Sequence, residues 1–115
     1  MTQEYRLDLD PKGRVTIPAK LRKSLGSQLI LCLVSDDERD LYVYTPKAWQ
    51  EIMETIDSRS LTAQQRFMLT HADIVVPDTQ GRITIHQRYI EALHIERAVT
   101  LRFTFRCVSV PPSDA

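Results

Sequence analysis

Two arginines stand at the end of the same five-residue pattern in two places in the sequence. The first copy reads DPKGR, from Asp10 to Arg14, and the second reads DTQGR, from Asp78 to Arg82. A guanidinium is permanently charged and presents a planar fork of N–H donors that matches carboxylates, phosphates and base edges. The repetition therefore predicts two equivalent cationic contacts for an anionic partner.

The charges of the chain are unevenly distributed, although its formal net charge is zero. Residues 1–26 carry a net charge of +3 and residues 78–106 carry +2, whereas residues 27–77 carry −4. Both copies of the pattern thus lie in basic stretches of an otherwise acidic chain, which favours attraction of a polyanion. Solvated surface charge would give the same distribution, so charge alone leaves both interpretations open.

The residues around each copy predict a tight β-hairpin. Apolar and polar residues alternate in YRLDL before the first copy and in RVTI at its end. Between these segments Asp10 can accept backbone N–H bonds, Pro11 fixes φ, and Gly13 tolerates the positive φ of a type I turn with a bulge. The second copy keeps the two turn-forming residues as Asp78 and Gly81. We expect the strands on either side of each turn to pair with each other.

The arginines are expected to point outward at the mouth of each hairpin. Because side chains alternate between faces, placing Val15 and Ile17 in the core turns Arg14 and Thr16 toward solvent. The second copy repeats this arrangement around Arg82. An ion pair between each arginine and its turn aspartate is the plainer alternative. The two interpretations are compatible, since a paired guanidinium is also an oriented one.

A short helix is predicted after each copy. Pro18 suits the first helical position and Gly26 a C-terminal stop. The solvent side of this first helix would carry the basic residues Lys20, Arg22 and Lys23. In the second copy Arg88 takes the place of Lys20, while His86 and His94 replace Pro18 and Gly26. The second helix should therefore be less sharply bounded.

The residues between the copies predict two strands and two helices. LILCLV and LYVY read as paired strands around the exposed turn SDDERD. A helix from Thr45-Pro46 carries the apolar stripe Trp49, Ile52, Met53 and Ile56. That stripe could lie in the core of the protomer or in a contact between subunits. A capping box, Thr62-x-x-Gln65, begins a second helix that extends to about Ala72.

The chain is expected to form one compact domain of 115 residues. After the second copy, alternation from Val99 to Cys107 predicts a strand, but no counterpart of the Trp-bearing helix follows. The predicted division is a first repeat over 4–47, a helical connector over 45–72, a second repeat over 73–107 and a tail over 108–115.

Several classes of protein are disfavoured by the sequence. The longest apolar run, Leu29 to Val34, is too short to cross a bilayer, and the first residues are polar, which predicts a soluble cytoplasmic protein. The spacing of Cys32 and Cys107 favours buried reduced thiols. We find no phosphate-binding loop and no catalytic constellation, and therefore expect no enzyme activity, cofactor, metal or small-molecule substrate. His71 and Asp73 are more typical of ordinary surface or core residues than of a catalytic or metal pair.

The sequence resembles the MraZ family of two-repeat bacterial transcription regulators in the SpoVT-AbrB superfamily. The resemblance covers roughly residues 4–103. Its specific parts are the double Asp-x-x-Gly-Arg, the segment YVYTPKAWQEI after the first repeat, and LTHAD just before the second. One Asp-x-x-Gly-Arg alone would be weak evidence, but two copies with these segments in order are specific.

The resemblance implies a mainly β, α+β fold: a pseudo-two-fold double SpoVT-AbrB-like barrel of swapped hairpins with connecting helices. It also implies a nucleoid-associated homo-oligomer, ring-like in shape, that binds double-stranded DNA at tandem promoter repeats. Such a protein usually represses a cluster of division and cell-wall genes. The family's DNA-contacting arginine falls on Arg14, with Arg82 its counterpart. The residues expected beside them at the DNA are Lys12, Thr16, Lys20, Arg22 and Arg88, and those that shape the turns are Asp10, Gly13, Asp78 and Gly81.

Two other functions remain as alternatives. An AbrB-type antitoxin would bind its own promoter and inhibit a toxin with a disordered tail, but the tail here is short and antitoxins carry a single repeat. An oligomerisation module that has lost DNA binding would not need the basic stretches or the two outward arginines.

Overall fold

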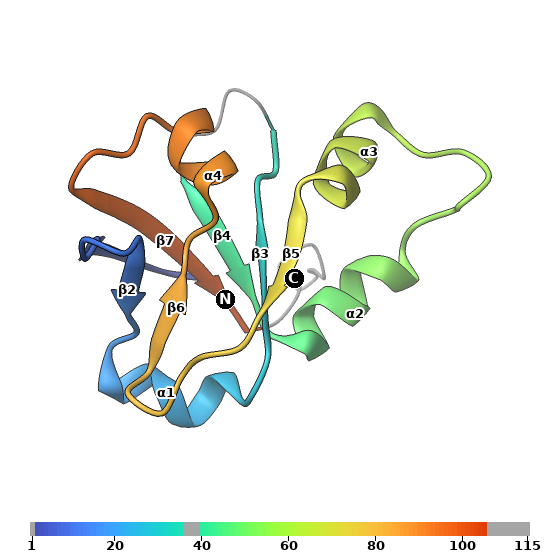
Figure 1. The fold of residues 1–115 in the computed structure, drawn as a ribbon. Coiled ribbons are helices and arrows are strands. Elements are labelled where there is room, and N and C mark those ends of the chain that lie inside the picture. The colour runs from blue at the N-terminus through green and yellow to red at the C-terminus, as the bar shows by residue number, and fades with distance from the viewer. Residues whose placement is uncertain (1, 36–39, 106–115) are drawn as a thin grey trace.

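The computed structural model describes residues 2–35 and 40–105, which form a mixed α+β fold (Figure 1). One five-stranded sheet has the order β1-β7-β4-β3-β5, and a separate two-stranded ribbon consists of β2 and β6. The strands are β1 (Thr2–Asp8), β2 (Arg14–Thr16), β3 (Leu29–Cys32), β4 (Leu41–Tyr44), β5 (Ala72–Val75), β6 (Arg82–Thr84) and β7 (Ala98–Thr104). The helices are α1 (Ala19–Leu25), α2 (Pro46–Glu54), α3 (Ala63–Thr70) and α4 (Gln87–Ala92).

The two repeats exchange strands. The first strand of the first repeat, β1, pairs antiparallel with β7 of the second repeat. The first strand of the second repeat, β5, pairs antiparallel with β3 of the first repeat. The strands after the two turns, β2 and β6, pair with each other. Each repeat therefore completes the other, as the resemblance implied.

The simple hairpins predicted from local sequence are wrong in their strand pairing. The turns do form: the Asp10 amide donates to the Arg14 carbonyl at 2.8 Å, and the Asp78 amide donates to the Arg82 carbonyl at 2.9 Å. Beyond each turn, however, the chain pairs with the other repeat. Pairing β2 with β6 places Val15 opposite Ile83, and each of these side chains is only 1% exposed. Burial of apolar side chains from both repeats thus overrides the local hairpin.

Both repeats contribute to one hydrophobic core. Val15 and Ile17 from the first repeat pack with Ile83 and Ile85 from the second, and Tyr89 and Phe103 are fully buried among them. Helices α1 and α4 lie at opposite ends of the β2–β6 ribbon (Figure 1). Neither repeat could bury these residues alone, so the orientation of one turn depends on the packing of the other.

A second, smaller core is formed by β3, β4 and α2, with Ile30, Cys32, Tyr44 and Ala48 as its buried residues. Strand β4 pairs antiparallel with β3 and parallel with β7. The capping box at Thr62 is present, and α3 ends at Thr70 rather than Ala72 because Ala72 begins β5. Trp49, Ile52 and Met53 of the predicted stripe lie on α2, but the helix ends at Glu54, before Ile56. All four side chains are half-buried, and the Trp49 ring is 5.5 Å from the Tyr44 ring.

Some predicted features lie outside the described residues. These are most of the acidic turn, residues 36–39, the end of the last predicted strand, and the tail over 108–115. Asp40, the last residue of the acidic turn, forms an ion pair with Arg102 of β7. Within residues 2–35 and 40–105, no helix is long and apolar enough to cross a membrane, and no group of potential ligands could hold a metal ion.

Candidate nucleic-acid interface

The β2–β6 ribbon presents a polar face that carries both arginines of the repeated pattern. Arg14 lies opposite Thr84, and Thr16 lies opposite Arg82. The apolar residues between them, Val15 and Ile83, point to the core. Arg14 and Arg82 are therefore diagonal neighbours on one face of the ribbon, at a Cα separation of roughly 7–8 Å. The two arginines form one compact contact surface rather than two distant ones.

The first turn fixes its arginine with three hydrogen bonds to one carboxylate. One oxygen of Asp10 accepts from the backbone amides of Lys12 at 2.9 Å and Arg14 at 2.8 Å. The other oxygen accepts from Arg14 Nε at 2.8 Å. Gly13 has a φ of 77°, which favours glycine because an L side chain is strained there. The Asp10 carboxylate therefore shapes the turn and also orients the Arg14 guanidinium.

The second turn repeats this geometry. Asp78 accepts from the backbone amides of Gln80 and Arg82 at 2.9 Å each, and from Arg82 Nε at 2.7 Å. Gly81 also has a φ of 77°. Each turn is hydrogen-bonded to the other repeat. The Ile17 amide donates to the Gly81 carbonyl and the Ile85 amide donates to the Gly13 carbonyl, both at 2.8 Å.

Each arginine keeps donors that the turn does not use. Only Nε is bonded to the aspartate, and no partner of either Nη group is found among the described residues. The Arg14 and Arg82 side chains are 26% and 30% exposed. Four N–H donors per guanidinium are thus available at the surface of the ribbon, in an orientation that the carboxylate has already fixed.

Both turn aspartates have a pKa below the ordinary value of 3.8. The main cause is the hydrogen bond from the backbone amide of the arginine, and its guanidinium adds to the effect. A carboxyl with a lowered pKa in the folded state stabilises the fold above its unfolded pKa, and this stability is lost as pH falls below about 4. The turns should therefore loosen in acid.

We expect Asp10→Asn and Asp78→Asn to lose less stability on acidification than the unmodified chain, because the substituted residue no longer takes up a proton on unfolding. The measurement is the free energy of unfolding in denaturant at about pH 6 and about pH 3. Asp8→Asn, an exposed residue outside the turn, is the control. If both turn variants lose as much as the unmodified chain, the carboxylates do not stabilise the turns.

The other predicted basic residues have different settings. Lys12 is exposed in the first turn, and Gln80 stands at its place in the second. Lys20 is exposed, with Nζ 5.4 Å from the centre of the Tyr5 ring. Arg22 donates from Nε to the Ile17 carbonyl at 3.0 Å and lies against Gly81 of the other repeat. Lys12 and Arg22 therefore add positive charge to different turns.

Arg88 is held by partners within the protein. Its guanidinium pairs with Asp73 at 2.9 Å and donates to the Tyr89 hydroxyl at 3.0 Å. The Tyr89 hydroxyl also lies 3.1 Å from the His71 carbonyl oxygen, and burial raises the pKa of Tyr89 to about 12. This network ties α4 to β5, so of the predicted residues Arg88 is the one most engaged in the fold.

Sequence reasoning missed the buried network around Tyr89. The available signal was a tyrosine on the inner face of a predicted helix, since a buried tyrosine hydroxyl requires a partner. His71 is likewise engaged, with Nδ1 2.8 Å from the Phe67 carbonyl and its ring stacked on Phe67. His71 and Asp73 thus serve the packing of β5 and α3.

Two histidines bound α4: His86 stands at the position of Pro18, and His94 at the position of Gly26. The His86 side chain accepts a hydrogen bond from the Arg88 amide at 3.0 Å and caps α4. His94 has a φ of 55°, the only positive φ of a non-glycine residue in the part of the chain that is described. Both ends of α4 are therefore defined, in a different way from those of α1.

The geometry defines a class of protein: two repeats with exchanged strands that present paired, carboxylate-held arginines on a β-ribbon. Among models of protein families, one matches the chain in both repeats. The model of the MraZ protein family, which is also described as antitoxin-like, matches residues 1–67 and 68–113, one match for each repeat. The chain belongs to the MraZ family.

Curated relatives support this assignment. The chain is 32% identical to "Transcriptional regulator MraZ" of Micrococcus luteus, with 84% of this chain and 70% of the relative covered. It is 37% identical to the protein of the same name from Caldanaerobacter subterraneus, with coverage of 84% and 69%. With the Paenarthrobacter aurescens relative the identity is 39% over 67% of this chain. That match spans only 56% of the relative, little more than half of its length.

Proposed function

We propose that this protein is a sequence-specific DNA-binding transcriptional regulator that represses a bacterial division and cell-wall gene cluster from tandem promoter repeats. The names of the relatives support regulation of transcription. The observation that carries DNA binding is the ribbon face on which Asp10 and Asp78 orient Arg14 and Arg82. Such a protein would act in the cytoplasm, associated with the nucleoid.

The ribbon suits the major groove of DNA. The groove admits a two-stranded β-ribbon, and a guanidinium can donate two bonds to guanine O6 and N7. Because Asp10 and Asp78 occupy only Nε, the Nη donors of both arginines remain for a base edge. Thr16 and Thr84 lie exposed on the same face and can contact bases or phosphates. Base contacts would come from this face.

The surrounding basic residues would contact phosphates. Lys12 is exposed in the first turn, Arg22 is exposed against the second turn, and Lys20 is exposed on α1 beside Tyr5. Phosphate contacts fix the register of a protein on DNA but carry little sequence information. Arg88 would contribute least, because its guanidinium is already bonded to Asp73 and Tyr89.

We further propose that the protein binds as a homo-oligomer through the side of the molecule formed by β5 and α2. Strand β5 is at the edge of the five-stranded sheet. Ile74 and Val76 there are 69% and 65% exposed, unusually high for large apolar side chains. Beside them lies an apolar cleft of about 460 Å³ lined by Trp49 and Met53 of the predicted stripe. An open strand edge with exposed apolar residues favours contact with another chain.

Specific binding should be strongly salt-dependent despite the zero net charge. Each phosphate contact releases counterions, so the logarithm of the binding constant should fall linearly with the logarithm of salt concentration. Lys12→Ala should reduce the slope by about 1, whereas Arg59→Ala, in the exposed segment between α2 and α3, should leave it unchanged. The measurement is fluorescence anisotropy with the gene's own upstream DNA and with random DNA. Equal affinity for both DNAs, or a flat salt dependence, would favour the oligomerisation module.

A further inference from the structure

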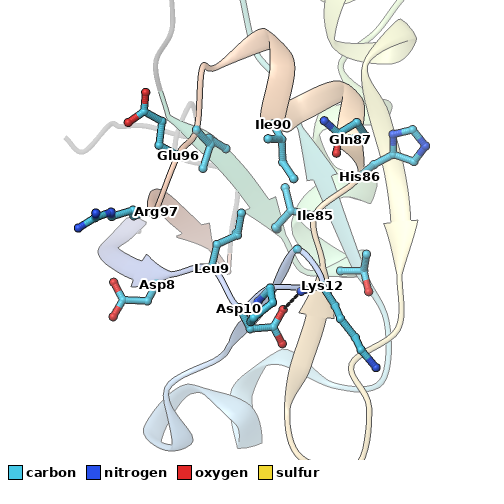
Figure 2. A pocket seen from close by; sticks show the side chains of 14 residues that line it. Asp8, Leu9, Asp10, Lys12, Ile85, His86, Gln87, Ile90, Glu96 and Arg97 are labelled. Atoms are coloured by element: carbon cyan, nitrogen blue, oxygen red, sulfur yellow. Dashed lines mark hydrogen bonds between the residues drawn. The ribbon is translucent and has the colours of Figure 1, made fainter.

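A cleft of about 1010 Å³ lies beside the first turn. Figure 2 shows the apolar side chains of Leu9, Ile85 and Ile90 at its centre, with charged side chains around them. The cleft runs from the first turn to α4 and to the segment that precedes β7. The cleft adjoins the polar face of the ribbon at Thr84 and Lys12, while its apolar part around Ile85 lies behind that face.

The same cleft occurs at the second turn, where it is much smaller. Its volume is about 270 Å³, and eight of its ten lining residues, all except Leu25 and Gly26, occupy positions that correspond to lining residues of the first cleft. The difference is Arg22, whose guanidinium lies flat on Gly81. A Cβ added to Gly81 would meet Arg22 Nε at 2.3 Å and Cζ at 2.5 Å. The chain thus fills its second cleft with its own arginine.

Arg22 is held there by three features. The glycine with positive φ leaves a flat surface without a side chain, the Ile17 carbonyl accepts from Nε at 3.0 Å, and apolar residues such as Leu25 line the wall. None of these partners is a carboxylate. The cleft therefore recognises the shape and the donors of a guanidinium on an aliphatic stem.

The first cleft has all three features, but no arginine side chain lies on its glycine. Gly13 has the same φ of 77°, and a Cβ added there would find its nearest neighbours, the Ile85 carbonyl oxygen and the end of Ile90, at 3.6 Å. No hydrogen bond to the Ile85 carbonyl, the counterpart of the Ile17 carbonyl, is found within the described ranges. Ile90 stands where Arg22 stands in the first repeat. Its shorter side chain comes no closer than 3.6 Å to a Cβ added to Gly13, so Gly13 is covered much less closely than Gly81 is by Arg22.

We propose that the cleft beside the first turn binds a guanidinium group on an aliphatic stem, supplied from outside the chain. The guanidinium would stack on Gly13 and donate to the Ile85 carbonyl, while the stem packs on Ile90. The charged residues around the cleft are Asp8, Asp10, Glu96, Lys12 and Arg97, and of these Asp10 is already paired with Arg14. This site goes beyond the proposed function, because no step of DNA binding requires it.

The direct test is a titration of the protein with N-acetyl-arginine amide, followed by NMR of the backbone amides. Saturable shifts should appear at Gly13 and Ile85. N-acetyl-lysine amide and N-acetyl-leucine amide are the matched probes, and we expect them to bind at least tenfold more weakly. Equal binding by the lysine or leucine probe, or no binding by the arginine probe, would overturn the proposal. A titration with free arginine distinguishes the two sources of the guanidinium. If only N-acetyl-arginine amide binds, the ligand is an arginine within a peptide. If free arginine binds as well or better, the ligand is a small metabolite.

Two variants test the comparison between the first cleft and the second cleft. Ile90→Arg should fill the first cleft as Arg22 fills the second, lowering probe affinity at least tenfold and raising the melting temperature. Arg22→Ile should open the second cleft and create a second probe site, with new shifts at Gly81 and Ile17. Unchanged binding in a folded Ile90→Arg protein, or no second site in Arg22→Ile, contradicts the proposal. Neither experiment contains DNA, so its outcome is independent of the proposed function.

Discussion

Replacement of Arg14 by alanine should weaken specific DNA binding by about 5- to 150-fold, the equivalent of about 1–3 kcal/mol for a lost bidentate base contact. The fold should remain intact, because Asp10 keeps its hydrogen bonds to the backbone amides of Lys12 and Arg14. The binding constant for the upstream DNA and for random DNA should be measured together with the melting temperature. A loss confined to the specific DNA would assign Arg14 to a base edge.

Arg82→Ala should have an effect of similar size. Local sequence suggested a smaller one, since the second helix lacks the counterparts of Pro18 and Gly26. In the structure His86 and His94 define that helix, and Asp78 holds Arg82 as Asp10 holds Arg14. The two arginines are therefore equally fixed.

Arg14→Lys is the matched control. Lysine keeps the charge but cannot bond the aspartate and a base edge through one planar group. It should retain most of the random-DNA affinity and lose most of the specific preference. If Arg14→Ala leaves affinity for the upstream DNA unchanged, the ribbon is not the reading surface and the basic stretches have another partner.

The chemistry of each turn could be predicted from the sequence because it is local. Asp10 and Gly13 lie within four residues of Arg14, and their hydrogen bonds need no distant partner. The pairing of the strands could not be predicted in this way. It depends on the burial of Val15 against Ile83, residues whose contact is invisible in either repeat alone. Only the resemblance to the MraZ family pointed to the exchange.

The role of Arg22 could not be predicted from local sequence either. Its place on the solvent side of a short helix predicted a phosphate contact, and it is indeed exposed. Its packing on Gly81 depends on the exchange, which brings the helix of one repeat to the turn of the other. Likewise, the acceptors of the Tyr89 hydroxyl come from β3 and from the residues around β5. Contacts between segments that are distant in the sequence decide how far each basic residue is engaged in the fold.

Tight binding should require tandem sites in a fixed helical phase. The Cα atoms of Arg14 and Arg82 are roughly 7–8 Å apart, which corresponds to about two base-pair steps along DNA. One protomer can therefore read only a short site. Linking protomers makes later contacts intramolecular and can raise affinity by about 10²–10⁴, provided that the assembly reaches all sites at once.

The test is to lengthen the spacer between two repeats by about five or about ten base pairs, half a turn or a full turn of DNA. The half-turn insertion moves the second site to the opposite face, so affinity should fall toward that of a single site. The full-turn insertion restores the face and should retain much more of the affinity. DNA with one repeat is the control, since an added spacer cannot change its phase.

Ile74→Asp connects this phase dependence to the proposed subunit contact. The side chain is 69% exposed, so the substitution should not disturb the core of the protomer. A buried carboxylate at the interface would oppose association. The variant should become monomeric, bind tandem DNA like single-site DNA, and respond equally to both insertions. If the unmodified protein already responds equally to both, or binds tightly as a monomer, then the affinity comes from one ribbon and the tandem mechanism is wrong.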